Sequence, residues 1–410
     1  MRPVEEQVQI LMQGTEYGDD ELKRTMAAEL RERLTTAVAE NRPLKVYLGI
    51  DPSSSDLHLG HTVPLFKLRQ FQDLGHDVTF LIGSFTGTIG DPSDKDKLRP
   101  QLSLEKTLEN AATFATQAFR VLDKSATKIQ YNHTWLSELS FKDVIELSSN
   151  FTVQQFLTRD NFRKRFDDNQ PIYLHEFFYA LMQGYDAVAL ETDVQVGGTD
   201  QLFNIVTAGR KLQAAHNMKP QVAIINGILP GTDGIIRMSK SLGNHIPIAT
   251  TAEDMYGKVM SVPDMAMPDF FRLVSRYEPS EIESILRDLS SGRRHPMDVK
   301  MELARAIVST FYGKEGAAAG EAHFKQVFRQ GELPDDMPVF ELGETALLVD
   351  IIFGAGLARS KGEVRRLIKQ GGIKLEGDKV EDTFLEISPN GEQIVQIGKR
   401  RFLRIVNASS

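Results

Sequence analysis

The stretch YLGIDPSSSDLHLGH (residues 47–61) has the pattern of a buried strand, a turn and the first turn of a helix. Residues 44–50 form a short apolar run that contains valine, tyrosine and isoleucine, which is typical of a buried strand. The segment DPSSSD then supplies turn residues and a helix N-cap for the apolar-periodic residues 57–74. A strand, a turn and a helix in this order indicate one unit of a parallel sheet.

The same pattern recurs after this stretch. DVTFLIG (77–83) is a second apolar strand, and the glycine-rich loop GTIGDPSDKDKLRP (87–100) and a helix at 103–122 follow it. Further strands are predicted near TKIQYN (127–132) and QVAIING (221–227). Strands that alternate with helices predict an α/β fold with a doubly wound, Rossmann-like parallel sheet, whose ligands bind beyond the carboxyl ends of the strands.

The length of the chain predicts more than one domain, because single cores rarely exceed ~250 to 300 residues and this chain has 410. After about residue 250 the pattern becomes wholly helical, and a proline-rich segment separates it from a small module of two helices and short strands. We therefore expect a helical amino-terminal extension at 1–44, a Rossmann-like catalytic domain at 45–248, an α-helical domain at 249–331, a linker at 332–344 and a small α+β module at 345–410.

Composition limits the chemistry and the location of the protein. A hydrophobic content of 41% and a charged content of 25% are typical of a globular protein, and no apolar run approaches the ~18 residues of a membrane span. The amino terminus has no pattern of a secretion signal, so we expect a cytoplasmic protein with no membrane association. The absence of cysteine excludes disulfides, thiolate nucleophiles and cysteine-ligated metals, which leaves oxygen and nitrogen groups for any chemistry.

Charge is unevenly distributed along the chain, whose net charge is -8. Residues 345–410 contain 11 basic and 8 acidic side chains, so this part carries +3 and the remainder -11. An acidic body with a basic tail indicates that a polyanionic partner would be held locally, by the tail and by selected patches.

Two segments have the residue types that bind phosphate. In HLGH, His58 and His61 are three residues apart at the start of a helix, where backbone N–H groups favour an anion, and Gly60 leaves room for a ligand. In RMSKS, Lys240 is a mobile point charge in a polar loop, and Arg237 adds a second cation. Either segment alone is more often an ordinary surface feature, but together they indicate a polyphosphate site.

A third segment, YALMQGYD, has the residue types that bind an amino acid. Tyr179, Gln183 and Asp186 are spaced by four and three residues, so they share one face of a helix. A polar stripe usually marks a solvated face, but buried here it could bind an α-amino group and a hydroxyl. Since the chain has no GxxxxGK[ST] motif and no well-placed GxGxxG, ordinary nucleotide triphosphatases, kinases and dinucleotide enzymes are disfavoured.

The pairing of HLGH with RMSKS resembles the signature of class I aminoacyl-tRNA synthetases, in which the two segments flank ATP. With YLGIDP, IGDPS, YALMQGYD and VGGTDQ, the chain is similar to bacterial tyrosyl-tRNA synthetases over essentially its whole length. The resemblance implies an ATP-dependent ligase that forms tyrosyl-adenylate and pyrophosphate from L-tyrosine and ATP, and then transfers tyrosine to the terminal ribose of its tRNA. It also implies Mg²⁺ with ATP, no structural metal, a homodimer, and an anticodon-side role for the helical domain.

The resemblance further assigns individual residues. Tyrosine would be bound by Tyr47, Asp91, Tyr179, Gln183, Asp186 and Gln201. ATP would be bound by Gly49, Asp51, Ser53, His58, Gly60, His61, Gly198, Asp200, Met238, Ser239 and Lys240. Catalysis would use His58, His61, Lys240 and Arg237, with Lys95 and Arg99 directed toward the departing pyrophosphate. The carboxyl-terminal module resembles the RNA-binding module named after ribosomal protein S-four, and its tRNA contacts would be Arg359, Lys361, Arg365, Arg366 and Lys369.

The sequence departs from the family pattern at a few positions. Arg237 replaces the usual first lysine of the RMSKS segment, and Asp94 and Asp96 flank Lys95 in the glycine-rich loop. Leu48 and Ser53 replace a frequent cysteine and the usual threonine. These changes bear on fine tuning rather than on the type of reaction.

Two alternatives remain open at this point. An enzyme for another amino acid, most plausibly tryptophan, would share the histidine and lysine segments, but Tyr47 and Asp186 argue against it. A non-catalytic RNA-binding relative would be free to lose HLGH or RMSKS, and both are intact.

Overall fold

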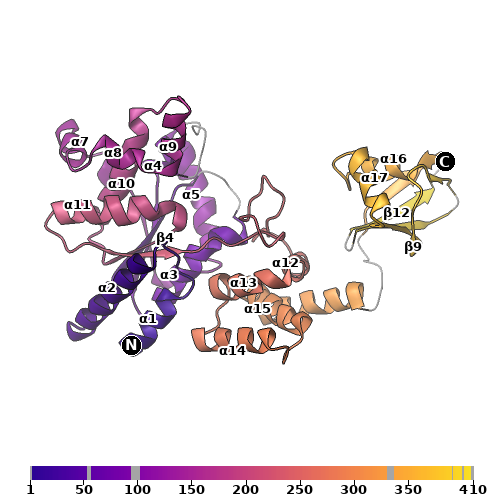
Figure 1. Ribbon diagram of the computed structural model, residues 1–410, viewed down its shortest axis with the longest axis horizontal. Helices are drawn as coiled ribbons and strands as arrows, with labels where there is room; N and C mark the ends of the chain where they lie inside the picture. The colour runs from indigo at the N-terminus through magenta and orange to yellow at the C-terminus, as the bar shows by residue number, and fades with distance from the viewer. Residues whose placement is uncertain are drawn as a thin grey trace. The chain divides into compact units, whose positions relative to one another are not determined.

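The computed structural model describes residues 2–52, 57–93, 102–329, 337–389, 391–398 and 401–407. The chain forms two compact units, Met1–Ala322 and His323–Ser410 (Figure 1). Among the helices in these described ranges, none has both the length and the apolar character that crossing a membrane requires.

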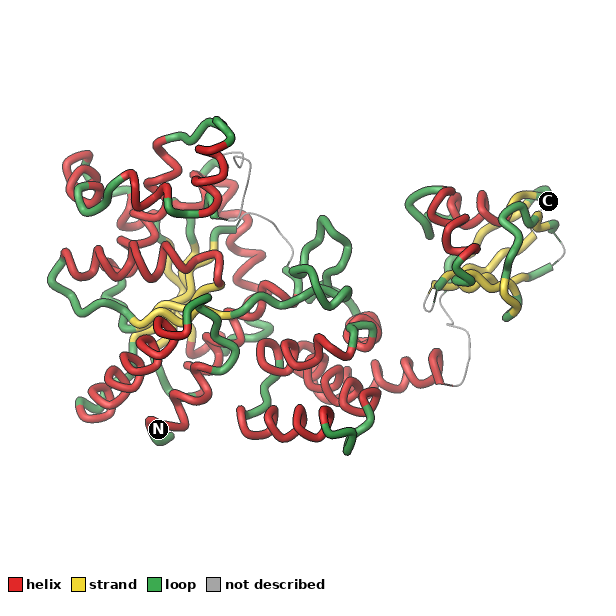
Figure 2. The backbone as a smooth tube through the Cα atoms, viewed as in Figure 1, coloured by secondary structure: helices red, strands yellow, loops and turns green. Residues whose placement is uncertain are grey.

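The first unit contains a five-stranded parallel sheet with the order β3-β2-β1-β4-β5. Figure 2 shows the strands between helices. The sheet confirms the predicted doubly wound fold, and its order changes direction at β1, where ligands of such sheets bind. The strands are β1 (Lys45–Ile50), β2 (Asp77–Ile82), β3 (Thr127–Tyr131), β4 (Val194–Gly198) and β5 (Val222–Asn226).

Helices surround this sheet and continue beyond it. They are α1 (Val4–Met12), α2 (Asp20–Ala39), α3 (Val63–Asp73), α4 (Thr86–Ile89), α5 (Leu104–Ala118), α6 (His133–Leu136), α7 (Phe141–Ser148), α8 (Val153–Leu157), α9 (Asp160–Asp167), α10 (Leu174–Ala189) and α11 (Arg210–Ala215), followed by α12 (Ala252–Met260), α13 (Met267–Val274), α14 (Pro279–Ser290) and α15 (Pro296–Arg329). A π-helical segment, Phe203–Gly209, precedes α11. Helix α15 is broken at Gly313, whose φ of 70° lies in the left-handed region that favours glycine.

Buried cations bind the amino-terminal helices to neighbouring parts of the unit. Arg33 of α2 donates to Asp193, next to β4, at 2.7 Å and to the carbonyl oxygens of Lys219 and Pro220, before β5. Lys67 of α3 donates to the carbonyl oxygen of Gln13, after α1, at 2.8 Å. Burial lowers the pKa of Lys67 to about 7, so its ammonium depends on such carbonyl acceptors.

The second unit has its own apolar core. Its sheet has the order β6-β12-β11-β8-β9, β7 and β10 form a separate two-stranded ladder, and two helices supply buried residues such as Ile352 and Val364. These elements are β6 (Val339–Leu342), β7 (Ala346–Leu347), α16 (Leu348–Gly354), α17 (Lys361–Lys369), β8 (Ile373–Leu375), β9 (Asp378–Lys379), β10 (Glu386–Ile387), β11 (Gln393–Ile397) and β12 (Arg401–Asn407).

One buried ion pair generates a stability prediction. Asp193 is buried and binds Arg33, Arg42 at 2.8 Å and the backbone N–H of Lys45 at 3.0 Å. Asp193→Ala would leave the buried Arg33 without its carboxylate, so we expect a loss of ~3 to 5 kcal/mol in the free energy of unfolding. Urea titration followed by fluorescence measures it, because the chain has one tryptophan, Trp135, which lies in this unit.

The matched control is Glu109→Gln, which breaks an exposed pair with Lys106 on α5. We expect it to cost less than ~1 kcal/mol. Equal effects of the two substitutions on the free energy of unfolding would contradict the claim that the buried Asp193 ion pair stabilises the fold.

Candidate active site

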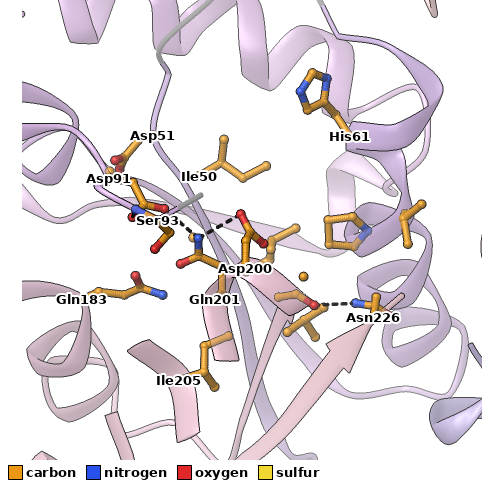
Figure 3. A pocket seen from close by; sticks show the side chains of 18 of the residues that line it. Ile50, Asp51, His61, Asp91, Ser93, Gln183, Asp200, Gln201, Ile205 and Asn226 are labelled. Atoms are coloured by element: carbon orange, nitrogen blue, oxygen red, sulfur yellow. Dashed lines mark hydrogen bonds between the residues drawn. The ribbon is translucent and has the colours of Figure 1, made fainter. Parts of the chain in front are cut away.

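A cavity of about 500 Å³ opens at the carboxyl ends of β1, β4 and β5. Figure 3 shows Asp51, Asp91, Gln183 and Gln201 gathered on one side of it and His61 across from them. This is the edge at which an open parallel sheet binds its ligands. The cavity therefore lies where strand ends and helix starts present their side chains.

A buried carboxyl group defines one end of the cavity. Asp186 of α10 is 3% exposed and accepts hydrogen bonds from Trp135 Nε1 at 2.8 Å and Asn132 Nδ2 at 3.2 Å. Burial raises the pKa of Asp186 to about 8, and the two donors oppose this shift only in part. The group is thus held in a fixed orientation in a low-dielectric site.

A buried phenol without a protein partner accompanies that carboxyl group. Tyr47 of β1 is 1% exposed, and within the described ranges its hydroxyl forms no hydrogen bond. Burial, followed by the nearby charge of Asp186, raises the pKa of Tyr47 well above its usual value, so the phenol stays neutral. A buried hydroxyl without a partner costs free energy, and a polar ligand group that binds there would remove this cost.

Polar side chains from four segments form a network beside this end. Tyr179 donates to Asp51 Oδ2 at 2.9 Å, and Thr86 donates to Asp51 Oδ1 at 2.7 Å. Gly83 makes room for this carboxylate, because a Cβ there would lie 1.9 Å from Asp51 Oδ1. Asp51, predicted among the ATP-binding residues, therefore contacts Tyr179 of the tyrosine set.

The remaining residues predicted to bind the amino acid are joined through amides. Gln201 donates to Asp91 Oδ2 at 2.6 Å, and Asn204 donates to Gln183 Oε1 at 3.0 Å and to Gln201 Oε1 at 3.1 Å. The carboxylate of Asp91 also accepts from the backbone N–H of Ser93 at 2.8 Å. Acceptor oxygens thus face a space in which an ammonium group could donate to them.

The two histidines lie at a 3₁₀ turn, Leu59–Thr62, that leads into α3. Their rings stack with centroids 3.7 Å apart, and the backbone N–H of His58 donates to His61 Nδ1 at 3.2 Å. Burial is the main cause that lowers the pKa of His58 to about 3 and of His61 to about 4, and the charge of Lys240 adds to both shifts. Both rings are therefore neutral near pH 7 and can offer one N–H each to a phosphate.

The RMSKS segment lies in a loop that one amide holds together. Asn244 is 6% exposed, donates to Asp233 Oδ2 at 2.5 Å and accepts from the backbone N–H of Ser239 at 2.8 Å. Position 231 must be glycine, because a Cβ there would lie 2.2 Å from Asn244 Nδ2. The loop also meets the histidine turn, where Gly60 N–H points to the sulfur of Met238 at 3.3 Å.

Most of the predicted site residues line the cavity, and a few do not or lie outside the described residues. Lys240 is exposed and is not among the residues that line the cavity. Ser53, Asp94, Lys95, Asp96 and Arg99 lie outside the described residues. The predicted residues that do line the cavity are Tyr47, Gly49, Asp51, His58, Gly60, His61, Asp91, Tyr179, Gln183, Asp186, Gly198, Asp200, Gln201, Arg237, Met238 and Ser239.

The predicted tRNA contacts lie on the second unit. Helix α17 buries Val364 and Ile368 in the core of that unit and leaves its basic residues exposed. The exposed residues are Lys361, Arg365, Arg366 and Lys369 of α17, and Arg359, which precedes the helix.

Sequence reasoning missed the residues that orient the predicted ones. Asn132 and Trp135 hold Asp186, Asn204 joins Gln183 to Gln201, and Asn244 holds the RMSKS loop. The position of Asn132 at the carboxyl end of a predicted strand was one available signal. In the part of the chain that the structure describes, no group of three or more histidine or acidic side chains could hold a metal ion.

Comparison with known proteins gives two matching family models. The model for tRNA synthetases class I (W and Y) matches residues 39–329, and the model for the Tyrosine--tRNA ligase SYY-like C-terminal domain matches residues 328–405. Among curated relatives, the Tyrosine--tRNA ligase of Moorella thermoacetica is 49% identical, covering 92% of this chain and 91% of its own length. That of Haemophilus influenzae is 48% identical, covering 94% and 96%, respectively.

Solved structures share the fold at lower identity. A C-terminally truncated mitochondrial tyrosyl-tRNA synthetase from Aspergillus nidulans has a TM-score of 0.62 and 21% identity, covering 79% of this chain and 94% of that one. A tryptophanyl-tRNA synthetase from Encephalitozoon cuniculi has a TM-score of 0.53 and 15% identity, covering 70% and 83%. At these identities the likeness concerns the fold alone.

The lowered pKa values of the two histidines generate a prediction. Because an unfolded histidine has a pKa near ~6.5, the unfolded chain takes up protons first as the pH falls from 6.5 toward 4, and these histidines make the fold less stable over that window. In the folded protein, histidine NMR signals assigned with His58→Asn and His61→Asn should show both rings neutral at pH 6. A midpoint near pH 6.5 for either ring would contradict the lowered pKa values of the pair.

Proposed function

Because the chain belongs to the class I tRNA synthetases for tryptophan and tyrosine, we propose that it is an ATP-dependent ligase that joins L-tyrosine to tRNA. The observation that carries the choice of tyrosine is the buried Tyr47 hydroxyl next to Asp186. The match of residues 328–405 to a tyrosine-enzyme domain and the names of the curated relatives support the same choice.

Recognition of the phenol follows from that pair. A tyrosine hydroxyl can donate to Asp186 and accept from Tyr47, which supplies both groups with partners. Phenylalanine would leave the phenol of Tyr47 unpaired, so it should be rejected. Enzymes of this class are themselves the reference case for such discrimination, at ~10⁵-fold without editing, a figure that is not obtained from this structure.

The ammonium and carboxylate of the substrate would lie on opposite sides of the network. Asp91 and Gln183 offer acceptor oxygens for the ammonium, together with the phenolic oxygen of Tyr179. Gln201 would then reach the carboxyl group, while Gly198 and Asp200 would lie near the ribose of ATP. This arrangement directs the carboxylate toward the histidine side of the cavity.

The first reaction needs no protein nucleophile. A carboxylate oxygen of tyrosine attacks the α-phosphorus of ATP, a P–O bond forms, and the bond to the departing pyrophosphate breaks. The protein contributes position and electrostatic stabilisation. His58 and His61 would donate N–H bonds to phosphate oxygens, and Lys240 and Arg237 would supply positive charge, with Lys95 and Arg99 as further candidates. Mg²⁺ would accompany ATP and neutralise part of its charge.

In the second reaction a hydroxyl of the terminal ribose of tRNA attacks the acyl carbon, and AMP leaves. Arg359 and the exposed basic residues of α17 would hold the tRNA through its phosphates, a salt-sensitive contact that is largely independent of base sequence. The helical segment 249–331 would form an anticodon-side domain, and the other predicted segments, 1–44, 45–248, 332–344 and 345–410, are kept as part of this proposal. A cytoplasmic location is also proposed.

A homodimer is proposed because large apolar side chains are exposed on two contacting helices of the first unit. Phe141 of α7 is 81% exposed and Leu174 of α10 is 73% exposed, and these two helices are in contact. Apolar surface of this kind is typical of a face that a partner covers. A second copy of the chain is the occupant that the family resemblance implies.

Two predictions test these proposals. In the first, Lys240→Ala removes a positive charge that acts on the phosphates in the transition state, so we expect tyrosine-dependent ATP–pyrophosphate exchange to slow by ~10²-fold while tyrosine binding changes little. Lys219→Ala, which removes an exposed lysine paired with Glu32, is the control and should leave exchange unchanged. Normal exchange in Lys240→Ala would refute the role of this lysine.

In the second, Phe141→Glu combined with Leu174→Glu places two charges on the proposed interface. Sedimentation should show a dimer for the unmodified protein and a monomer for the double variant. Met265→Glu changes a 73% exposed side chain elsewhere on the first unit and should leave the dimer intact. A dimer that survives the double substitution would place the interface on another face.

A further inference from the structure

The two segments proposed to bind ATP are joined at one buried site next to the cavity. Leu57 precedes the histidine turn, Ile248 follows the RMSKS loop, and Phe114 belongs to α5, and these three buried side chains form one apolar cluster. Phe311 of α15 packs against the same cluster. We call Leu57, Phe114, Ile248 and Phe311 the anchor cluster.

Backbone hydrogen bonds add to this cluster. The N–H of Leu59 donates to the Ile246 carbonyl at 2.8 Å, and the N–H of Ile248 donates to the Leu57 carbonyl at 3.2 Å. The N–H of Leu57 donates to Gln117 Oε1 of α5 at 2.9 Å. The histidine turn and the carboxyl end of the RMSKS loop are therefore held together as one body.

A tyrosine from α15 binds the base of that loop. The Tyr312 hydroxyl lies 3.2 Å from the Ile248 carbonyl oxygen and also donates to the Thr250 carbonyl, and the Thr250 N–H points back to the hydroxyl oxygen at 3.4 Å. The Arg120 guanidinium donates to the same Ile248 carbonyl and lies 5.6 Å from the centre of the Tyr312 ring. One phenol and one guanidinium thus fix the peptide segment 248–250.

The position of Tyr312 in α15 links this contact to the helical part of the unit. It is the residue before Gly313, where the regular helix breaks. The part of α15 before the break carries buried residues such as Leu303 and Ile307. A rigid, well-packed helix end therefore presents the Tyr312 hydroxyl to the loop base.

We infer that Tyr312 is a positioning residue for adenylate formation, whose hydroxyl, together with Arg120, fixes the base of the RMSKS loop relative to the histidine turn. This inference rests on the proposed function. Reactions that depend on placement lose rate steeply when a catalytic group shifts by ~1 Å. Tyr312 itself does not line the cavity, so it acts through the loop that carries Arg237 and Lys240.

The test is Tyr312→Phe, which removes the hydroxyl and keeps the ring. In ATP–pyrophosphate exchange we expect kcat to fall roughly tenfold while KM for tyrosine stays within about twofold, because the tyrosine end of the cavity is untouched. The control is Tyr277→Phe, which removes a hydroxyl that donates to Glu302 of α15 at 2.9 Å, away from the loop. Arg120→Met should lower kcat in the same direction as Tyr312→Phe.

A second readout follows the loop itself. Trypsin cleaves after exposed Arg237 and Lys240, and loosening the loop base should speed cleavage there several-fold in Tyr312→Phe but not in Tyr277→Phe. Unchanged kcat and unchanged cleavage in Tyr312→Phe would overturn the inference, as would equal effects in the control. Absence of exchange in the unmodified protein would instead overturn the proposed function, and the cleavage comparison would still decide the role of Tyr312.

Discussion

The site depends on one constraint: a carboxyl group on helix α10 and a phenol on the central strand β1 are buried together. Asp186 and Tyr47 are both almost fully buried, and the phenol has no partner among the described residues. A fold tolerates such a pair when a ligand supplies the missing hydrogen bond, and it must hold both groups firmly until then. Trp135 and Asn132 hold the carboxyl group, while the position of Tyr47 in β1 fixes the phenol.

The phosphate side of the cavity depends on the same strand. The chain leaves β1 at Ile50 and returns as the stacked histidine turn, which the RMSKS loop and α15 hold through the anchor cluster. Because the low pKa values of both rings keep them neutral, positive charge must come from the loop rather than from the histidines. One strand and one turn thus carry residues for choosing the amino acid and for activating its carboxylate. Helices far along the chain supply supporting contacts.

The local sequence pattern was sufficient to predict the strands with continuous apolar runs. It was also sufficient to predict that Tyr179, Gln183 and Asp186 share one helix face, since both features depend on neighbouring residues only. Strand β4 was not predicted, because Gln195 and two glycines interrupt its apolar pattern. Asn132 and Trp135 could not be paired with Asp186 from sequence, because the sheet order brings them together. The lowered pKa values of the two histidines likewise depend on their surroundings in the fold, which spacing does not reveal.

The most direct measurement is ATP–pyrophosphate exchange by the unmodified protein, with tyrosine, phenylalanine and tryptophan compared as kcat/KM. The buried pair predicts that tyrosine supports exchange and that both other amino acids are rejected by several orders of magnitude, as in the reference enzymes of this class. Comparable kcat/KM for phenylalanine or tryptophan would contradict the claim that Asp186 and Tyr47 select the substrate.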